Sequence, residues 1–311
     1  MTLERRRPLP PAPGNARRTP GAWLAFGAAA TLIALAAFAM AGYALHLRGG
    51  QDMDAYWNAA LRLRSGEALY IPEVANSPTL YRYAPWFAYA WIPLTYLPHD
   101  AVHLGWVTVL TAAALGTTLP LARHGVVGWL ALAFFLPIQL MGVAYGNVQP
   151  LLVAVLLWGA GGRSGPVWIA LTASLKAVPL LLILVDIGRG RWRRAGVTAA
   201  LTALLIVPML FFDLTHYSVQ PGPSQLSLAA YAPWLWVGVA VAVGVVALRL
   251  APGRYRWLAA SVAMLAALPR LLTYETSFAL VGLVEERGPW ATRATAEPDQ
   301  GSSIAVAAEP S

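Results

Sequence analysis

Residues 165–188 read GPVWIALTASLKAVPLLLILVDIG, and this apolar stretch decides how the chain is organised. Lys176, near its middle, is the only lysine among the 22 Lys and Arg residues. An ionisable side chain at membrane depth costs roughly 2.5–3.5 kcal/mol on insertion scales, so by default it marks a functional site with a partner. No acidic residue stands within nine positions of Lys176, and we therefore expect its partner to be an anion that binds and leaves. The alternative is a lysine that snorkels to the membrane interface.

The composition of the whole chain is that of a polytopic membrane protein. Hydrophobic residues make up 58% of the 311 residues and charged residues only 12%, well outside the range of soluble globular domains. The mean hydropathy is +0.57. We expect an all-α integral membrane protein with about eight to ten full or half-spanning helices. The windows that meet the criterion of about 20 apolar residues are residues 22–47, 101–121, 126–145, 195–212, 228–248 and 257–272.

Clusters of arginine orient these spans in the membrane. Five arginines precede the first window, which places the N-terminus in the cytoplasm by the positive-inside rule, and the same rule places residues 189–194 and 249–256 inside. We expect a disordered basic segment over residues 1–20, one membrane domain over residues 21–284 and a disordered tail over residues 285–311. The net charge is +8, but the arginines lie in short segments between apolar runs and not along one face. The charge therefore indicates membrane topology and not a nucleic-acid partner.

The arginine cluster after residue 188 indicates two short helices in the opening stretch. A single crossing would put residues 189–194 outside, against their charge. Legs over residues 166–175 and 179–187 would each be about 15 Å long at 1.5 Å per residue, and they would leave a break at Lys176. Broken helices at membrane depth are tolerated only where they line a protein or water cavity. We therefore expect Lys176 to point into a cavity.

The longest polar stretch before the C-terminal tail is an acidic loop over residues 48–80, which this topology places outside the cytoplasm. Within it, residues 54–64 form a predicted amphipathic helix that Gly66 ends. Residues 86–97 are apolar but short and contain proline, so we expect a re-entrant or interfacial segment. This assignment leaves the turn at residues 145–150 on the outer side.

Three polar features converge on the outer side in this topology. They are the acidic loop, the amides of Asn147 and Gln149, and the break at Lys176. A cavity with a carboxylate, an ammonium group and amides could bind an anionic lipid head group together with a polyhydroxyl acceptor.

Short motifs along the chain carry a resemblance to a known family. They are DMDAYWNAA at residues 52–60 with GEALY at 66–70, YRYAPWF at 81–87, PLTYLP at 93–98, GNVQP at 146–150, LKAVPL at 175–180 and PRLLTYE at 269–275. In this order they resemble glycosyltransferase family 87, the polyprenyl-phosphate-mannose-dependent mannosyltransferases of the GT-C class. The resemblance covers about residues 20–280.

The chain departs from the family pattern in several places. The Tyr-Pro-Pro pattern of the family reads YAP at residues 83–85, and the Gly-Gln-x-Asn order reads GNVQ at residues 146–149. Family members usually continue with further spans after the Pro-Arg motif at residues 269–270. The resemblance therefore implies either a compact variant or a helix bundle that a partner protein completes.

The resemblance implies a reaction and roles for four charged residues. A sugar, mannose in the family, would move from a polyprenyl-phosphate donor to a lipid or glycan acceptor on the outer face of the cytoplasmic membrane. Inverting transfer needs a base for the acceptor hydroxyl and charge stabilisation for the departing phosphate. The family pattern assigns the base to Asp52, with Asp54 as a second candidate whose other role is a helix N-cap. Lys176 would hold the phosphate, with Arg270 as a second cation.

Further polar side chains could position the sugar or the acceptor. An aromatic belt at the membrane interface explains such tyrosines at least as often, and a polar loop cap explains the amides equally well. These candidates are Tyr56, Tyr83, Asn147, Gln149 and Tyr274.

The residues alone leave two other functions open. A transporter or flippase of lipid-linked sugars would use the same cavity and cation without a base, and a non-catalytic membrane scaffold is the third option. His99 and His103 have the spacing of a helical zinc site, with Asp100 between them. No third ligand is evident and the chain has no cysteine, so we expect neither a metal nor a cofactor.

Overall fold

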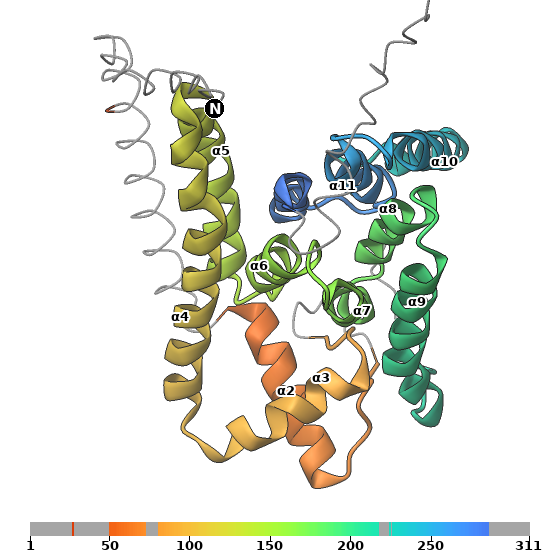
Figure 1. The fold of residues 1–311 in the computed structure, drawn as a ribbon. Coiled ribbons are helices and arrows are strands. Elements are labelled where there is room, and N and C mark those ends of the chain that lie inside the picture. Colours follow the sequence, from red (N-terminus) through yellow and green to blue (C-terminus); the bar gives the residue numbers. More distant parts are fainter. Residues whose placement is uncertain (1–26, 28–49, 73–79, 218–223, 225, 286–311) are drawn as a thin grey trace, which may run out of the picture.

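The computed structural model describes residue 27 and residues 50–72, 80–217, 224 and 226–285. Across this part of the chain every regular element is a helix, which confirms the all-α expectation (Figure 1). Nearly all of the expected first span at residues 22–47 lies outside the described residues. The same holds for the expected disordered segments, residues 1–20 and almost all of 285–311.

Helix α2 (Gln51–Ser65) opens the acidic loop, and it starts earlier than the predicted residue 54. Its amphipathic character is as predicted, since Trp57 is buried and Asn58 is exposed. Gly66 ends α2 in the left-handed conformation with φ 75°, which glycine adopts without steric penalty.

The short helices α3 (Pro85–Trp91) and η1 (Ile92–Tyr96) follow the loop and pack against α2, at the bottom of Figure 1. Pro85 stands at the start of α3, where its missing N–H leaves no intrahelical bond unmade. With 7 and 5 residues, neither helix can cross a hydrocarbon core of about 30 Å. A full span is therefore absent from residues 86–97, as the sequence indicated.

Two long apolar helices form a hairpin on the left of Figure 1. They are α4 (His99–Thr118), which continues into η2 (Leu119–His124), and α5 (Gly125–Ala144). Gly125 has φ 67° and separates the two helices. Both match predicted windows, and the stretch His99–Ala144 is long and apolar enough to cross a membrane.

The opening stretch folds into α7 (Gly165–Leu175), η3 (Val178–Leu182) and α8 (Ile183–Gly188). Lys176 directly follows α7 in an extended conformation, φ −135° and ψ 120°, so the predicted break is confirmed. Helix α6 (Gln149–Gly159) precedes α7, and each has 11 residues, or about 16 Å at 1.5 Å per residue.

The C-terminal half contributes two more candidate spans, Trp192–Phe211 and Pro233–Leu250. The first consists of α9 (Trp192–Ile206) and η4 (Val207–Phe211), and the second is α10 (Pro233–Leu250). Helix α11 (Arg256–Ala266) follows. The expected span at residues 257–272 is wrong, because α11 ends at Ala266 after 11 residues. Pro269 lacks an N–H and disfavours helical geometry at the residue before it. The remaining elements in this half are the short helices η5 (Leu228–Ala230) and η6 (Thr273–Leu283).

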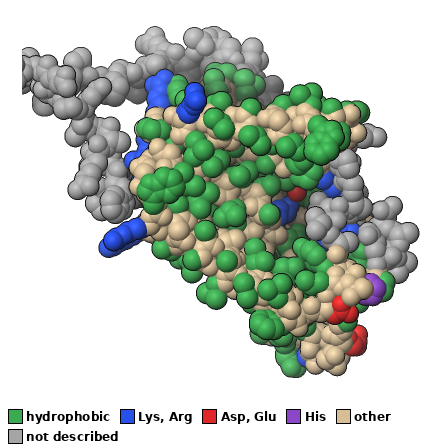
Figure 2. Space-filling view, turned by 90° about the vertical axis from the view of Figure 1, so that its right-hand side faces the viewer, with side chains coloured by type: hydrophobic (Ala, Val, Ile, Leu, Met, Phe, Trp, Pro, Cys, Tyr) green, Lys and Arg blue, Asp and Glu red, His purple; other side chains and the backbone are tan. Residues whose placement is uncertain are grey.

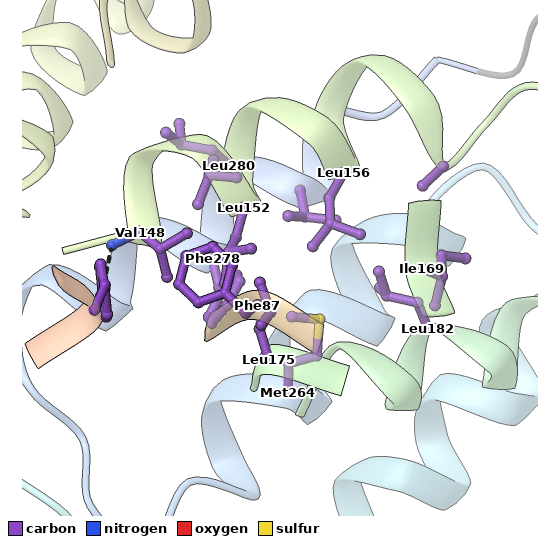
Figure 3. Packing of buried hydrophobic residues seen from close by; sticks show 14 of the residues in the cluster. Phe87, Val148, Leu152, Leu156, Ile169, Leu175, Leu182, Met264, Phe278 and Leu280 are labelled. Atoms are coloured by element: carbon purple, nitrogen blue, oxygen red, sulfur yellow. Dashed lines mark hydrogen bonds between the residues drawn. The ribbon is translucent and has the colours of Figure 1, made fainter. Parts of the chain in front are cut away.

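Apolar side chains fill a buried core and also lie on the outer surface of the helix bundle. Figure 3 shows the core cluster, in which Leu156 of α6, Met264 of α11 and Phe278 of η6 are all fully buried. Figure 2 views the side on which α9 and α10 lie, and hydrophobic side chains are spread across it. In a bilayer such a face lies against lipid, while the short helices stay inside the bundle.

Candidate functional site

The turn between α5 and α6 lies against the start of α2 and holds it in place (Figure 1). The backbone N–H of Asp52 donates to the carbonyl of Tyr145 at 3.1 Å. The same turn is tied to α4, because Trp106 Nε1 donates to the carbonyl of Gly146 at 2.8 Å. Two segments far from α2 in the sequence, the α5–α6 turn and the helix α4 that is tied to this turn, therefore fix the first turn of α2.

Asn147 places its amide against the carboxylate of Asp52. Its Nδ2 donates to Asp52 Oδ2 at 2.7 Å, and its Oδ1 accepts from the backbone N–H of Gln149 at 2.8 Å. Asn147 is buried, so both ends of the amide are held by the protein. Among the described residues no hydrogen bond reaches the other oxygen of Asp52, which leaves one carboxylate oxygen held and one available to a ligand.

The environment of Asp52 makes its carboxylate a stronger base. Burial raises the pKa of Asp52 above its ordinary value, against the opposing effects of the Asn147 hydrogen bond and of the charges on Lys176 and Arg82. A catalytic base works best when its pKa lies closer to the operating pH than that of an exposed aspartate.

Lys176 forms an ion pair that its sequence neighbourhood did not indicate. Its Nζ lies 3.2 Å from Oε1 of Glu275, and the two side chains are 11% and 3% exposed. The expectation that Lys176 has no fixed acidic partner is therefore wrong. Glu275 is nearly a hundred positions away in the sequence, at the end of the motif PRLLTYE. Membership in that motif was the one signal that could have found it.

Tyr274 connects the ion pair to the carboxylate–amide pair. Lys176 Nζ lies 5.0 Å from the centroid of the Tyr274 ring, and the Tyr274 hydroxyl is 3.5 Å from Asn147 Nδ2. Burial and then the charge of Asp52 raise the pKa of Tyr274, while Arg270 lowers it. Asp52, Asn147, Lys176 and Tyr274 thus form one cluster, with Arg270 within electrostatic reach.

Two predicted sugar-binding tyrosines lie behind this cluster. Tyr56 is fully buried, and its hydroxyl donates to the Tyr83 hydroxyl and accepts from the backbone N–H of Val148, both at 3.3 Å. Tyr83 is half-buried, and burial and then the charge of Asp52 raise its pKa. Tyr56 therefore supports the wall of the site, and Tyr83 is the more accessible of the two.

Gln149 is directed away from the carboxylate. It is fully buried, and its Nε2 donates to Ser277 Oγ of η6 at 3.3 Å. The order of the two amides in GNVQ thus gives Asn147 the contact to Asp52 and gives Gln149 a contact to the C-terminal segment.

Asp54 is not brought into the cluster. The N-cap alternative for Asp54 is wrong, because α2 begins at Gln51 and Gly50 occupies the N-cap position. Residues two apart in a helix do not face each other, so Asp54 points to α4, where it lies 3.1 Å from Nε2 of His99. Both carboxylates lie in the first turn of α2, and the helix directs them to different sides.

A second polar cluster occupies the other ends of α6 and α7. Arg194 contacts the buried carboxylate of Asp186 at 3.1 Å and donates to the carbonyls of Ala160 and Gly162 at 2.9 and 2.8 Å. A cavity of about 710 Å³ there is lined by Arg163, Arg191, Arg193 and Arg194. The arginine-rich ends and the Asp52 cluster thus lie at opposite ends of these two helices.

Replacing Gly50 by alanine is expected to destabilise the protein more than replacing Gly66 by alanine. Both glycines have positive φ, 73° and 75°, so alanine adds about 1–2 kcal/mol of backbone strain at either. A Cβ at Gly50 would also overlap the Tyr145 carbonyl that holds Asp52, whereas a Cβ at Gly66 meets open space. Thermal unfolding in detergent checks this expectation. Equal losses for the two variants would show that the contact to Tyr145 does not fix α2.

The comparison with known families identifies a family of glycosyltransferases. Residues 81–221 match the family model described as Glycosyltransferase family 87. No curated protein and no solved structure matches the chain. The matched range contains Asn147 and Lys176, while Asp52 and Glu275 lie outside it.

Proposed function

We propose that this chain, which belongs to glycosyltransferase family 87, transfers a sugar from a polyprenyl-phosphate donor to a lipid or glycan acceptor. Its family and its apolar helices make it a membrane glycosyltransferase. The observation that carries the finer proposal is the contact of a carboxylate with a buried amide beside a nearly buried ammonium group, formed by Asp52, Asn147 and Lys176.

Asp52 is the proposed general base. Its held oxygen orients the carboxylate, and the other oxygen can accept the proton of the acceptor hydroxyl. The hydroxyl oxygen then attacks the anomeric carbon, and the bond from this carbon to the phosphate oxygen breaks with its electron pair on the phosphate. The raised pKa of Asp52 supports this role, because it makes the carboxylate a better proton acceptor.

Lys176 is the proposed phosphate ligand, with Arg270 as the second cation. An ammonium group next to the departing phosphate stabilises the charge that develops there. The cation–π contact of Lys176 with Tyr274 and its ion pair hold the ammonium group in place before the donor binds. Head-group anchoring remains the competing role for Arg270.

The sugar would lie between the base and the phosphate ligand. It would contact Asn147 and Tyr274, which link Asp52 to Lys176, and Tyr83, which feels the charge of Asp52. Mannose, the GT-C fold class and a partner protein that completes the bundle are proposals that follow from the family resemblance. The direct test is transfer of label from a radiolabelled polyprenyl-phosphate mannose by the purified protein.

We further propose that the Asp52 cluster opens to the outer side of the cytoplasmic membrane. The arginine-rich ends of α6 and α7 support this orientation, since the positive-inside rule places such clusters in the cytoplasm. The N-terminus would then also be cytoplasmic.

Cysteine labelling is expected to separate the two sides. The chain has no cysteine, and Ser65 and Ser164 are both exposed, at the end of α2 and at the start of α7. In intact cells an impermeant thiol reagent should label Ser65→Cys, and it should label Ser164→Cys only after permeabilisation. The opposite pattern would reverse the proposed orientation.

A further inference from the structure

We propose that Glu275 weakens the grip of this site on lipid phosphate, so that the spent carrier can leave after transfer. Glu275 would act as a positioning residue through Lys176 and would not touch the reacting atoms. The inference rests on the proposed function, because it concerns the phosphate of the donor.

The carboxylate of Glu275 is fixed on both sides. Oε1 accepts from Lys176 Nζ at 3.2 Å, and Oε2 accepts from the backbone N–H of Leu272 at 3.0 Å. The side chain is only 3% exposed. A phosphate that binds Lys176 therefore meets a carboxylate that cannot swing away into water without breaking its contact to the backbone.

The charges around the site show why such a carboxylate is useful. Glu275 offsets the charge of the ammonium group that would bind the phosphate, because the two groups form an ion pair at 3.2 Å. A polyprenyl-phosphate sugar is a phosphodiester with one negative charge.

Transfer makes the lipid phosphate more negative. The departing phosphate is a monoester with a charge of about −1.5 to −2 at pH 7, and the acceptor proton moves to Asp52 and removes one negative charge there. Both changes strengthen the attraction of the site for the product. Without Glu275 the charge of Lys176 would not be offset, and the more highly charged product would be retained more strongly than the donor.

Binding of radiolabelled farnesyl monophosphate to the purified full-length chain in detergent tests the proposal without turnover. Glu275→Gln should bind this probe at least about fivefold more tightly than the unaltered chain. This is the effect that one unit charge about 4 Å away has even at the dielectric constant of bulk water. Glu275→Asp keeps the charge and serves as the matched control, with affinity near that of the unaltered chain.

Turnover gives a second readout that a purely structural role would not produce. Glu275→Gln should lower both KM for the donor and kcat, because product release slows while donor binding tightens. Thermal unfolding of each variant is compared first. Should Glu275→Gln not fold, Glu275→Ala makes the same charge change with a smaller side chain.

The outcomes separate this inference from the function on which it rests. Unchanged or weaker probe binding in the charge-removing variants overturns the inference, as does an equally large gain in affinity in Glu275→Asp. An unaltered chain that takes up no more probe than empty detergent micelles overturns the phosphate site itself.

Discussion

Replacing Asp52 by asparagine should lower sugar transfer by about 10²–10⁴-fold, the range that general base catalysis contributes. Asparagine keeps the size of the side chain and can still accept the hydrogen bond from Asn147 Nδ2, but it cannot accept a proton. Initial rates with a radiolabelled polyprenyl-phosphate sugar measure the loss. Donor binding should stay near that of the unaltered chain, because Asp52 does not hold the phosphate.

The pH dependence of the unaltered chain supplies a second measure of the same role. Because burial raises the pKa of Asp52, activity should fall with decreasing pH at a higher pH than an exposed aspartate would cause. The same shift means that the ionised carboxylate destabilises the fold above its folded-state pKa. Asp52→Asn is therefore expected to unfold at the same or a slightly higher temperature, even though it is nearly inactive.

Asp54→Asn is the matched control for this prediction. It makes the same chemical change two residues away, in the same helix, at a side chain that contacts His99 and not Asn147. Its activity should stay within a few-fold of the unaltered chain, since it changes a partly exposed pair worth about 0–1 kcal/mol. If Asp52→Asn retains full activity, or if Asp54→Asn is the inactive variant, the assignment of the base is wrong.

Replacing Lys176 by alanine should weaken donor binding by about 10–150-fold, which corresponds to the 1.5–3 kcal/mol of a hydrogen bond to a charged group. Equilibrium binding of a labelled polyprenyl-phosphate sugar measures this loss. Lys176→Arg should restore only part of it, because a planar guanidinium does not occupy the position of a compact ammonium group.

Stability needs its own control in this experiment. Lys176→Ala leaves the Glu275 carboxylate buried without its cation, and breaking such a pair destabilises a fold by about 3–5 kcal/mol. The double variant Lys176→Ala/Glu275→Gln removes both charges and should recover most of the stability. It should bind the donor about 10–150-fold more weakly than Glu275→Gln, from which it differs only at Lys176. Equal donor binding in these two variants would return Lys176 to a structural role.

Hydropathy and helix-breaking residues were enough to predict most of the fold. The windows at residues 101–121 and 126–145 correspond to α4 and α5. A long apolar run in a membrane has to satisfy its backbone hydrogen bonds internally, and a helix does this. The break at Lys176 followed from Pro179 and from the charge of the residues after it. The window at residues 257–272 failed because apolar composition continues past the point where Pro269 stops the helix.

The candidate site was predictable only where local motifs carried it. Asp52, Asn147, Lys176 and Tyr274 lie in four separate motifs, and their order along the chain gave the grouping but no distances. Glu275 was missed as a site residue because an ion pair across nearly a hundred positions leaves no periodic signal in the sequence.

Local geometry also separated residues that the sequence could not separate. The side chains of Asp52 and Asp54 leave α2 in different directions. The sequence does not give these directions, because they depend on where the helix starts. Helix starts are uncertain by one or two residues even when assigned from coordinates. Here an earlier start at Gln51 turned Asp54 toward His99.

The most direct test of the account follows the fate of the donor. The purified chain is reconstituted with a polyprenyl-phosphate mannose labelled in the sugar, together with a lipid extract of the cells that express it. The account predicts that label leaves the phosphate lipid for a new product, that free polyprenyl phosphate forms in equal amount, and that Asp52→Asn forms neither. Donor that moves between the two membrane leaflets with its label still attached would contradict the account and indicate a transporter.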